Sequence, residues 1–347
     1  MHYRTLGRTG CVVSTLALGT MTFGTETARD EAFAQLDTFV EAGGTLVDTA
    51  DVYGAGRAEA ILGEWFARRP ADVVDRIVLV TKGRFPYTPV LGAEGASRRH
   101  LRRALDNSLR RLGRDHVDMY MVHSWDPLTP LEETLGFLDD AVHSGKISYP
   151  GVSNYLGWQV QKACDLADAR GWTPPAALQP SYSLLVREIE WEIVPSVQAN
   201  GMGMIVWSPL GGGWLTGKYT RAGRPTGATR LGEDPHRGIE AYGKRAGRPQ
   251  TWAILEELAR IAGDRSASLA QIALAWVAQR PAVSSVLLGA RTSAQLADNL
   301  AAASIHLSDD EMRLLDVVSA PECGDYPYGP DGVEQRSRDL PGAEPSE

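Results

Sequence analysis

Short apolar runs alternate with longer amphipathic segments along most of this chain. In the longer segments apolar residues recur at intervals of three and four, which is typical of helices with one buried face. The short runs are bounded by glycine or polar residues, which favours buried strands. The pattern amounts to eight strand-helix units, with no helix assigned after the seventh strand. The predicted strands carry the sequences TLALG, TLVDT, RIVLVTK, VDMYMVH, GVSN, AALQ, GMIVWS and VSSVLLG, and the predicted helices span residues 29–42, 58–69, 97–112, 131–143, 157–169, 189–199 and 293–301.

The alternation of strands and helices predicts how the strands pair. Strands separated by helices pair in parallel, and eight is the number at which such a sheet closes into a barrel. An open doubly wound sheet, the alternative, often carries G-x-G-x-x-G after its first strand, whereas Gly19 and Gly24 are too far apart for that motif. We therefore predict an α/β fold, a (β/α)8 TIM barrel. Residues 3–6 and 11–13 flank the turn GRTG, which predicts an N-terminal β-hairpin.

Two segments interrupt the alternation. Residues 211–248 hold ten glycines and, with eight basic residues against three acidic ones, a net charge of +5. A long basic loop at a strand end predicts a lid over an anionic ligand, and the alternative is a solvated flexible insertion. The tail 323–347 is rich in proline, glycine and charge, so it is either disordered or laid over the barrel mouth by Tyr326 and Tyr328. We expect one barrel domain, residues 1–322, followed by this tail.

Composition narrows the classes of function. With 347 residues, 43% of them hydrophobic, the chain can bury a sizeable core. A formal net charge of -8 disfavours a nucleic-acid binder and favours a small-molecule partner. Three cysteines without close spacing suggest neither a disulfide framework nor a metal site, which predicts a reducing, cytoplasmic location. The chain has no apolar leader and no apolar run long enough to cross a membrane, so we expect no membrane association.

Polar residues follow the apolar part of most predicted strands. In a closed parallel barrel these positions reach the same C-terminal rim, where the active sites of such barrels lie. Each also has an ordinary alternative: Asp48 can cap a turn, Lys82 can be a surface charge, and His123 can be a hydrogen-bonded rim histidine. Their recurrence at one rim favours a shared site. The residues concerned are Asp48, Lys82, His123, Ser153, Asn154, Gln179 and Ser208.

Tyr53 lies five residues after Asp48, on the loop that leaves the second strand, and can lean over the barrel mouth. A phenol with a pKa of about 10 is a weak acid at neutral pH, but a nearby ammonium stabilises its phenolate and lowers that pKa. Lys82 supplies the ammonium, Asp48 can hold it in place, and His123 offers a hydrogen bond to a substrate oxygen. The set can protonate a carbonyl oxygen as it becomes an alkoxide, while a hydride must come from elsewhere. The alternative for Tyr53 is an aromatic ring packed within a loop.

Several segments also carry a resemblance. They are LGRTGCVVSTLALGTMTFG, DTADVYGAGRAEAILGEW, VLVTK, DMYMVH, GVSN, QPSYSLL, WSPLGGGWLTGKY and LGARTSAQLADNL, in that order. Together they resemble the aldo-keto reductase family from about residue 3 to about residue 319. The resemblance implies a tetrad of Asp48, Tyr53, Lys82 and His123, with Tyr53 as general acid in reduction and general base in oxidation. It also implies a nicotinamide cofactor bound without a Rossmann domain, and it permits a monomer or a homo-oligomer.

The remaining motifs suit the parts of such a cofactor. Trp207 can offer a flat face to the nicotinamide ring, and polar strand ends can bind its carboxamide. Glycines at the start of the lid allow close approach of a pyrophosphate, whose charge Lys218 and Arg230 can meet. A Ser/Thr-capped helix begins beside Arg291, our candidate for the adenosine 2'-phosphate, so we expect NADP(H). The expected cofactor contacts are Thr22, Asp48, Ser153, Asn154, Gln179, Trp207, Ser208, Pro209, Leu210, Gly211, Gly212, Lys218, Arg230, Gly289, Arg291, Gln295 and Asn299.

Some of these residues have alternatives, and two positions depart from the family pattern. Trp207 alone is more typical of a core, and Arg291 can be a surface arginine beside an ordinary capped helix. Where some branches of the family carry a basic residue this chain has Gln295, which leaves Arg291 more of the phosphate charge to meet. Pro150 removes one hydrogen-bond donor from the strand that ends in GVSN.

The predicted function is the reversible, NADPH-dependent reduction of an aldehyde or ketone to an alcohol. One alternative is an NADP(H)-binding regulatory or partner subunit with weak reductase activity, like the potassium-channel beta subunits of the family. Another is a barrel hydrolase or isomerase without nicotinamide. Sugars, aryl aldehydes and polycyclic ketones all stay open as substrates. The predicted substrate contacts are Phe23, Tyr53, Phe85, His123 and Trp125, and Trp158 and Trp214 lie on loops of the same rim.

Overall fold

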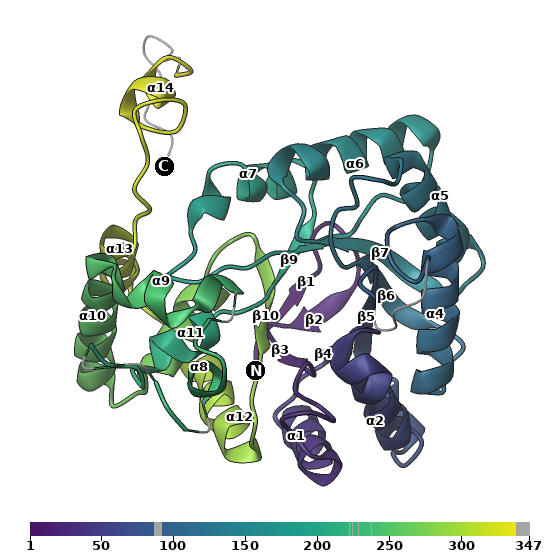
Figure 1. The fold of residues 1–347 in the computed structure, drawn as a ribbon, viewed down its shortest axis with the longest axis horizontal. Helices are drawn as coiled ribbons and strands as arrows, with labels where there is room; N and C mark the ends of the chain where they lie inside the picture. Colours follow the sequence, from purple (N-terminus) through teal and green to yellow (C-terminus); the bar gives the residue numbers. More distant parts are fainter. Residues whose placement is uncertain (87–91, 222, 224, 228, 237, 338–347) are drawn as a thin grey trace.

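The fold is a closed barrel of eight parallel strands, seen in a computed structural model that describes residues 1–86, 92–221, 223, 225–227, 229–236 and 238–337. Each strand pairs with the next, the last pairs with the first, and helices surround the strands (Figure 1), which confirms the predicted (β/α)8 barrel. The barrel strands are β3 (Leu16–Gly19), β4 (Leu46–Asp48), β5 (Val78–Gly83), β6 (Val117–Val122), β7 (Ile147–Ser153), β8 (Ala177–Gln179), β9 (Gly203–Val206) and β10 (Val283–Leu288).

The predicted N-terminal hairpin is confirmed as well. Strands β1 (Tyr3–Thr5) and β2 (Val12–Ser14) pair antiparallel. Leu6 and Val13, from the hairpin, are fully buried in the same apolar cluster as Leu46 of β4. The hairpin therefore packs against the apolar part of the barrel interior, and the carboxyl ends of the strands lie at the other end.

The outer helices form because their apolar residues share one face. In α4 (Arg98–Leu112), Leu101, Leu105 and Leu109 recur every four residues and are buried, while most of its arginines are exposed. The Ser97 side chain accepts a hydrogen bond from the first turn and so caps its start. The other outer helices are α1 (Arg29–Glu41), α2 (Arg57–Phe66), α3 (Ala71–Val74), α5 (Leu131–His143), α6 (Gly157–Arg170), α7 (Ile193–Ala199), α12 (Ser293–Leu300) and α13 (Asp309–Val318).

Two parts of the helical ring differ from the prediction. Between β9 and β10 lie α10 (Pro249–Arg265) and α11 (Leu269–Ala278), which were not predicted. Helix α11 is apolar on almost every side because it is buried nearly all round, so its sequence shows little helical period. The helix predicted over 189–199 begins only at Ile193, since Glu192 has non-helical backbone angles. Among the described helices, none combines the length and the apolar character that crossing a membrane requires.

The described part of the lid loop 211–248 contributes buried aromatic residues to the main apolar core. Trp214 is fully buried there, stacks on Tyr242 at 5.4 Å between ring centroids, and meets Tyr219 and Trp252 edge-on. Residues 222, 224, 228 and 237 of the loop lie outside the described residues. Short helical turns carry the rest, namely η3 (Gly211–Thr216), α8 (Arg230–Glu233), η4 (Gly238–Glu240) and α9 (Tyr242–Ala246).

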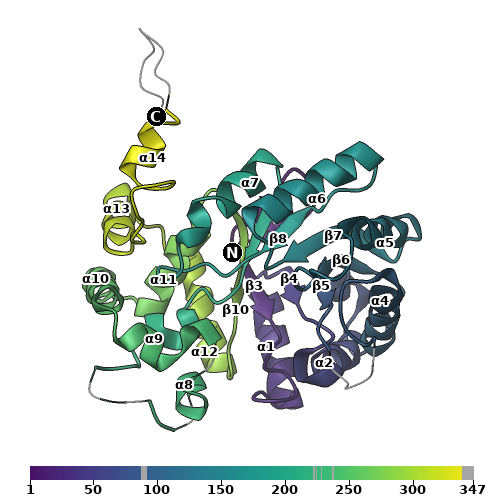
Figure 2. The ribbon, with the colours of Figure 1, turned by 45° about the horizontal axis from the view of Figure 1, so that its top comes forward.

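The C-terminal tail extends beyond the barrel. Its short helix α14 (Pro330–Glu334) lies past α13 at the edge of the molecule (Figures 1 and 2). Tyr328 stacks on Trp191 at 5.1 Å between ring centroids, and its hydroxyl donates to Glu192 at 2.6 Å. Residues 338–347 of the predicted tail lie outside the described residues.

Candidate active site

Strand alternation aims three polar side chains into the barrel mouth. Asp48, Lys82 and His123 each lie two residues after an apolar residue of the barrel interior. Because successive side chains of a strand point to opposite faces, each of the three shares the inward face of that apolar neighbour. The sequence thus places them at the same end of the barrel, as predicted.

Lys82 is the centre of the hydrogen bonds at this end. Its ammonium donates to the Asp48 carboxylate at 2.7 Å and to the Thr49 carbonyl at 2.8 Å, and its nitrogen is 3.5 Å from the Tyr53 hydroxyl. The other Asp48 oxygen accepts from the Gln179 side-chain amide at 2.8 Å. Lys82 and Asp48 are 0% and 1% exposed, so water does not screen this ion pair.

Burial sets the proton affinity of these groups. Burial alone lowers the pKa of Lys82, but the charges of Asp48 and Tyr53 outweigh it and raise that pKa, so the amine stays protonated. For Tyr53, burial raises the pKa above its ordinary value, and the opposing effect of Lys82 is smaller. The expectation that Lys82 lowers the pKa of Tyr53 overall is therefore wrong, because desolvation of the phenolate is the larger effect. The phenol holds its proton at neutral pH.

His123 completes the group. Its ring lies edge-on to the Tyr53 ring at 5.8 Å between centroids, and its Nδ1 is buried without a hydrogen-bond partner among the described residues. Burial lowers the pKa of His123 well below its ordinary value, and the positive charges of Lys82 and Arg84 lower it further. The imidazole is therefore neutral at physiological pH and can donate a single hydrogen bond.

Neighbouring strand ends bring polar groups beside this catalytic end. Asn154 donates to the His123 carbonyl at 2.9 Å and accepts from the Trp207 indole at 3.1 Å. Ser153 donates to the Gln179 carbonyl at 2.8 Å. Asn154 has a φ of 56°, in the left-handed region, and this conformation turns the chain at the end of β7. The predicted carboxamide contacts are thus brought together around Trp207.

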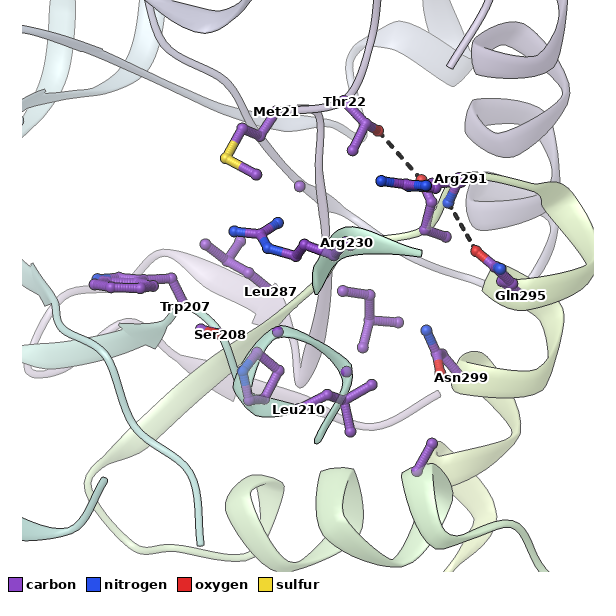
Figure 3. Close-up of a pocket in the computed structure, with 18 of the residues that line it drawn as sticks. Met21, Thr22, Trp207, Ser208, Leu210, Arg230, Leu287, Arg291, Gln295 and Asn299 are labelled. Carbon is purple, nitrogen blue, oxygen red and sulfur yellow. Dashed lines mark hydrogen bonds between the residues drawn. The ribbon is translucent and has the colours of Figure 1, made fainter. Parts of the chain in front are cut away.

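A cavity of about 860 Å³ connects this catalytic end with the lid loop. Figure 3 shows Trp207 and Ser208 at one side, Gln295 and Asn299 at the other, and Arg230 between them. Lys82 and Gly211 are the two predicted cofactor or tetrad residues that do not line it. The lining includes Thr22, Asp48, Tyr53, His123, Ser153, Asn154, Gln179, Trp207, Ser208, Pro209, Leu210, Gly212, Lys218, Arg230, Gly289, Arg291, Gln295 and Asn299.

The start of the lid loop forms a glycine cradle. Gly212 and Gly213 have φ of 67° and 93°, and a Cβ at Gly212 would stand 2.4 Å from the Glu240 carboxylate. That carboxylate accepts from Ser208 and from the Arg230 guanidinium, the latter at 3.0 Å. Only glycine leaves space for an acidic group so close to the backbone. The Glu240 carboxylate therefore occupies the cradle, bonded by Ser208 and Arg230.

The predicted phosphate residue Arg291 has partners that the sequence did not reveal. Its Nε lies 2.6 Å from Glu26, and its two terminal nitrogens bond Glu233 of the lid at 3.0 and 2.7 Å. Gln295 accepts from its backbone amide at 2.9 Å. The argument that an unpaired guanidinium awaits the 2'-phosphate is therefore wrong, because two carboxylates hold Arg291 across the cavity.

The predicted substrate aromatics fall into two groups. Phe85 and Trp125 are half-buried at the rim: Phe85 meets the His123 ring at 4.9 Å, and Trp125 meets the exposed Trp158 at 5.4 Å between centroids. Phe23 and Trp214 are fully buried in the main apolar cluster, whereas Phe85 and Trp125 are half-buried; none of the four is among the residues that line the cavity. Phe23 is therefore placed in the core and Trp214 within the lid, which argues against substrate contacts for both.

Sequence reasoning missed the acidic side of the cavity. The lining includes Glu26, Glu240 and Asp298, and Glu233 forms an ion pair with Arg291, which also lines the cavity. The three acids of the lid were counted only as a reduction of its positive charge. In the described part of the chain, no group of three or more His, Cys, Asp or Glu side chains is arranged to hold a metal.

Known proteins are similar in sequence to this chain over most of its length. The sequence profile of the Aldo/keto reductase family matches residues 15–320. The chain is 35% identical over 340 residues to an uncharacterized oxidoreductase, YrpG, of Bacillus subtilis (strain 168), which covers 94% of this chain and 98% of that protein. It is 35% identical over 316 residues to a probable voltage-gated potassium channel subunit beta of Oryza sativa subsp. japonica, covering 88% and 92%.

A third relative carries the name of a reductase. This chain is 34% identical over 332 residues to L-glyceraldehyde 3-phosphate reductase of Escherichia coli (strain K12), covering 90% of this chain and 94% of that protein. The family match and the relatives agree with the barrel and with the motif resemblance. The chain belongs to the aldo/keto reductase family.

Proposed function

We propose that this protein reduces an aldehyde or ketone to an alcohol with NADPH, and that Tyr53 supplies the proton. One observation carries the proposal. The Tyr53 hydroxyl, the Lys82 ammonium and the His123 ring converge at one end of the cavity, with the buried Asp48 carboxylate beside the ammonium. When bound, NADPH supplies the hydride. Membership of a family of reductases supports the same class of reaction.

Each residue has a role that follows from its protonation state. Tyr53 keeps its proton at neutral pH, because burial raises its pKa, and can give that proton to the substrate oxygen. Lys82, 3.5 Å away, then stabilises the phenolate. Neutral His123 donates a hydrogen bond to the same oxygen without competing as the acid. In the reverse direction the Tyr53 phenolate accepts the proton of the alcohol, so the reaction is reversible.

The cavity suits NADP(H) along its length. The Trp207 indole, held by Asn154, offers a face to the nicotinamide ring, and the cradle at Gly212 with Arg230 suits the pyrophosphate. Arg291 lines the cavity directly before the Thr292-capped helix α12, and this position supports a 2'-phosphate contact and so NADP(H) over NAD(H). For that contact the phosphate has to replace or share the carboxylates that now bind the guanidinium.

The substrate side of the site is aromatic. Phe85 meets the His123 ring, Trp125 is half-buried two residues after His123 in the chain, and both suit an apolar or aromatic carbonyl compound. The predicted reducing, cytoplasmic location stays a prediction. The predicted monomer or homo-oligomer stays a prediction.

Replacing Tyr53 by phenylalanine tests the proposed acid. We expect Tyr53→Phe to lower kcat for NADPH oxidation with an aldehyde panel by about 10²- to 10⁴-fold, since general acid catalysis contributes about that much. NADP+ binding, followed by quenching of Trp207 fluorescence, should change little in the same variant. Equal rates for the variant and the wild type would show that Tyr53 is not the acid.

A regulatory subunit that binds NADP(H) is the second candidate function. The relative named as a probable potassium channel subunit beta supports it. A regulatory subunit with weak activity predicts tight NADPH binding and turnover so slow that Tyr53→Phe changes it little. The aldehyde panel and the fluorescence titration together therefore separate the two candidates.

A further inference from the structure

Arg84 is a cation at the substrate side of the site that no step of the proposed reaction uses. It follows strand β5 directly, two residues after Lys82. Its guanidinium carbon lies 4.8 Å from the centroid of the Phe85 ring, and that ring meets His123 at 4.9 Å. The Phe85 ring therefore lies between the Arg84 guanidinium and the His123 ring, which would bind the carbonyl oxygen of a substrate.

The guanidinium of Arg84 has no carboxylate partner among the described residues. No acidic side chain of the described residues lies within 4 Å of it, and the undescribed segment 87–91 contains no acidic residue. One terminal nitrogen donates to the Trp125 carbonyl at 3.3 Å, while Nε is buried without a hydrogen-bond partner among the described residues. A half-buried cation in this state is incompletely satisfied.

Asp126 is the acidic residue that acts electrostatically with Arg84, but its hydrogen bonds are made with other groups. Asp126 feels the charge of Arg84, but its carboxylate accepts three other hydrogen bonds, from the Ala96 amide at 2.7 Å, the Thr129 hydroxyl at 2.6 Å and the Leu128 amide at 3.0 Å. Lys82, the next charge along the strand, is positive. Asp126 therefore acts on Arg84 through its charge without a direct contact within 4 Å, and the Nε of Arg84 still lacks a hydrogen-bond acceptor among the described residues.

The backbone of Arg84 is strained. Its φ is 145°, a value that residues with a side chain rarely adopt. Such strain persists only where the surrounding structure holds it, and it is concentrated at ligand and catalytic sites. Here the Gly95 amide bonds the Arg84 carbonyl at 2.9 Å and holds the strained residue beside Phe85.

We infer that Arg84 binds a carboxylate on the carbonyl substrate, which makes an aromatic or similarly flat aldehyde or ketone acid the preferred substrate class. The inference rests on the proposed reductase function. A single guanidinium matches the single charge of a carboxylate, whereas a phosphate dianion calls for more than one cation. The ring of such a substrate can lie along Phe85 and Trp125, with the carbonyl at Tyr53 and His123.

A matched pair of aldehydes tests this inference. 4-Carboxybenzaldehyde carries the charge, and its neutral methyl ester has the same ring and the same aldehyde. We expect kcat/KM of the wild type to favour the acid over the ester by about 10-fold or more, the usual gain from one charge-assisted hydrogen-bond pair. Arg84→Gln should lower this acid-to-ester ratio by about 10- to 100-fold, mainly through KM, and Arg84→Lys should retain most of it.

Two further measurements keep the result unambiguous. Arg57→Gln removes an exposed arginine near the same rim and should leave the acid-to-ester ratio at the wild-type value. If neither aldehyde consumes NADPH, the reductase function fails, and titrating each aldehyde against tryptophan fluorescence still decides whether wild type binds the acid more tightly than the Gln variant does. A ratio that is the same for wild type and Arg84→Gln, in turnover or in binding, overturns the inference and leaves Arg84 a structural contact of Trp125 and Phe85.

Discussion

The two ends of the cavity hold their charges in different ways. At the catalytic end, Lys82 and Asp48 come from adjacent barrel strands and are 0% and 1% exposed. The opposite end of the cavity would hold the cofactor phosphates in the proposed function, and we call it the phosphate end. There, Arg230 lies in lid helix α8 and Arg291 in the loop after β10, and their side chains are 27% and 21% exposed. The partners of these arginines are carboxylates of the lid and of the loop after β3. One end is a fixed part of the barrel, and the other consists of ion pairs that a ligand can replace.

The difference follows from what each end has to do. Lys82 must stay charged beside Tyr53 through the reaction, so its counter-ion is buried and its geometry is set by the sheet. Under the proposed function the end with Arg230 and Arg291 accepts and releases a phosphate, so its cations need counter-ions that exchange. A half-exposed ion pair is worth little because water screens it, whereas a buried pair is costly to break. Four predictions test this contrast, two at each end.

The largest expected effect comes from removing the buried cation. Lys82→Met leaves the Asp48 carboxylate buried with only Gln179 to bond it, so we expect unfolding free energy to fall by about 3 to 5 kcal/mol. Reductase activity should fall by at least about 10²-fold, since the phenolate loses its stabilising charge. Urea unfolding and NADPH oxidation measure the two effects.

The double variant Asp48→Asn, Lys82→Met separates charge from packing. With both charges gone no ion is left unpaired, so most of the lost stability should return while activity stays low. A single Lys82→Met variant as stable as the wild type would show that the catalytic end is no more fixed than the lid end.

A second effect at the catalytic end depends on pH. Asp51 is fully buried, and neither of its carboxylate oxygens has a hydrogen-bond partner among the described residues. Burial, together with the neighbouring charge of Glu59, raises the pKa of Asp51 to about 7. In the unfolded chain the same carboxyl ionises near a pH of about 4. As pH rises between these values, the folded state keeps a proton that the unfolded state loses, so the stability of the fold decreases.

Asp51→Asn should remove this dependence. Relative to the wild type, the unfolding free energy of the variant should increase as pH rises from about 4 to about 7, by a total on the order of 2 to 4 kcal/mol. Above about pH 7 the difference should stay constant. Urea unfolding at a series of pH values measures the gain. Asp30→Asn, at an exposed carboxyl, serves as the control. A constant difference between Asp51→Asn and wild type across this range contradicts a raised pKa at Asp51.

The same contrast explains what the sequence could predict. Asp48, Lys82 and His123 were predicted because strand period and parallel pairing together fix both the face and the end of the barrel. Arg291 was predicted from the capped helix after the eighth strand. Its partners Glu26 and Glu233 were not, because they lie on segments whose conformation no period determines.

Two other misses have different physical causes. Helix α11 was missed because a helix buried nearly all round has no polar face to reveal its period. The pKa of Tyr53 was assigned the wrong direction because the sequence shows that a cation is near but not that the phenol is desolvated. Charge neighbours can be inferred from motifs, whereas burial depends on the whole fold.

At the phosphate end, Arg230 should carry more of the cofactor affinity than any other residue of the lid. It faces the cavity beside the cradle and is held by Glu240 at 3.0 Å. We expect Arg230→Met to raise the Kd of NADPH by about 10- to 100-fold and to lower stability less than Lys82→Met does, because Arg230 itself is a quarter exposed although its partner Glu240 is buried. Arg221→Met, at a lid arginine that is 67% exposed, is the control. A loss of stability in Arg230→Met as large as that in Lys82→Met would show that the Arg230–Glu240 pair is as fixed as the Lys82–Asp48 pair.

The smallest effect should also have the opposite sign. If the carboxylates on Arg291 are counter-ions that the 2'-phosphate replaces, then Glu233→Gln and Glu26→Gln lower the cost of that exchange. Each should tighten NADPH binding by about 3- to 10-fold and change NADH binding by less than about 2-fold, since NADH has no 2'-phosphate. Fluorescence titration with both cofactors measures the two constants. Weaker NADPH binding in Glu233→Gln would mean that this ion pair closes the lid over the cofactor, in which case the phosphate end is as much a fixed part of the bound enzyme as the tetrad is.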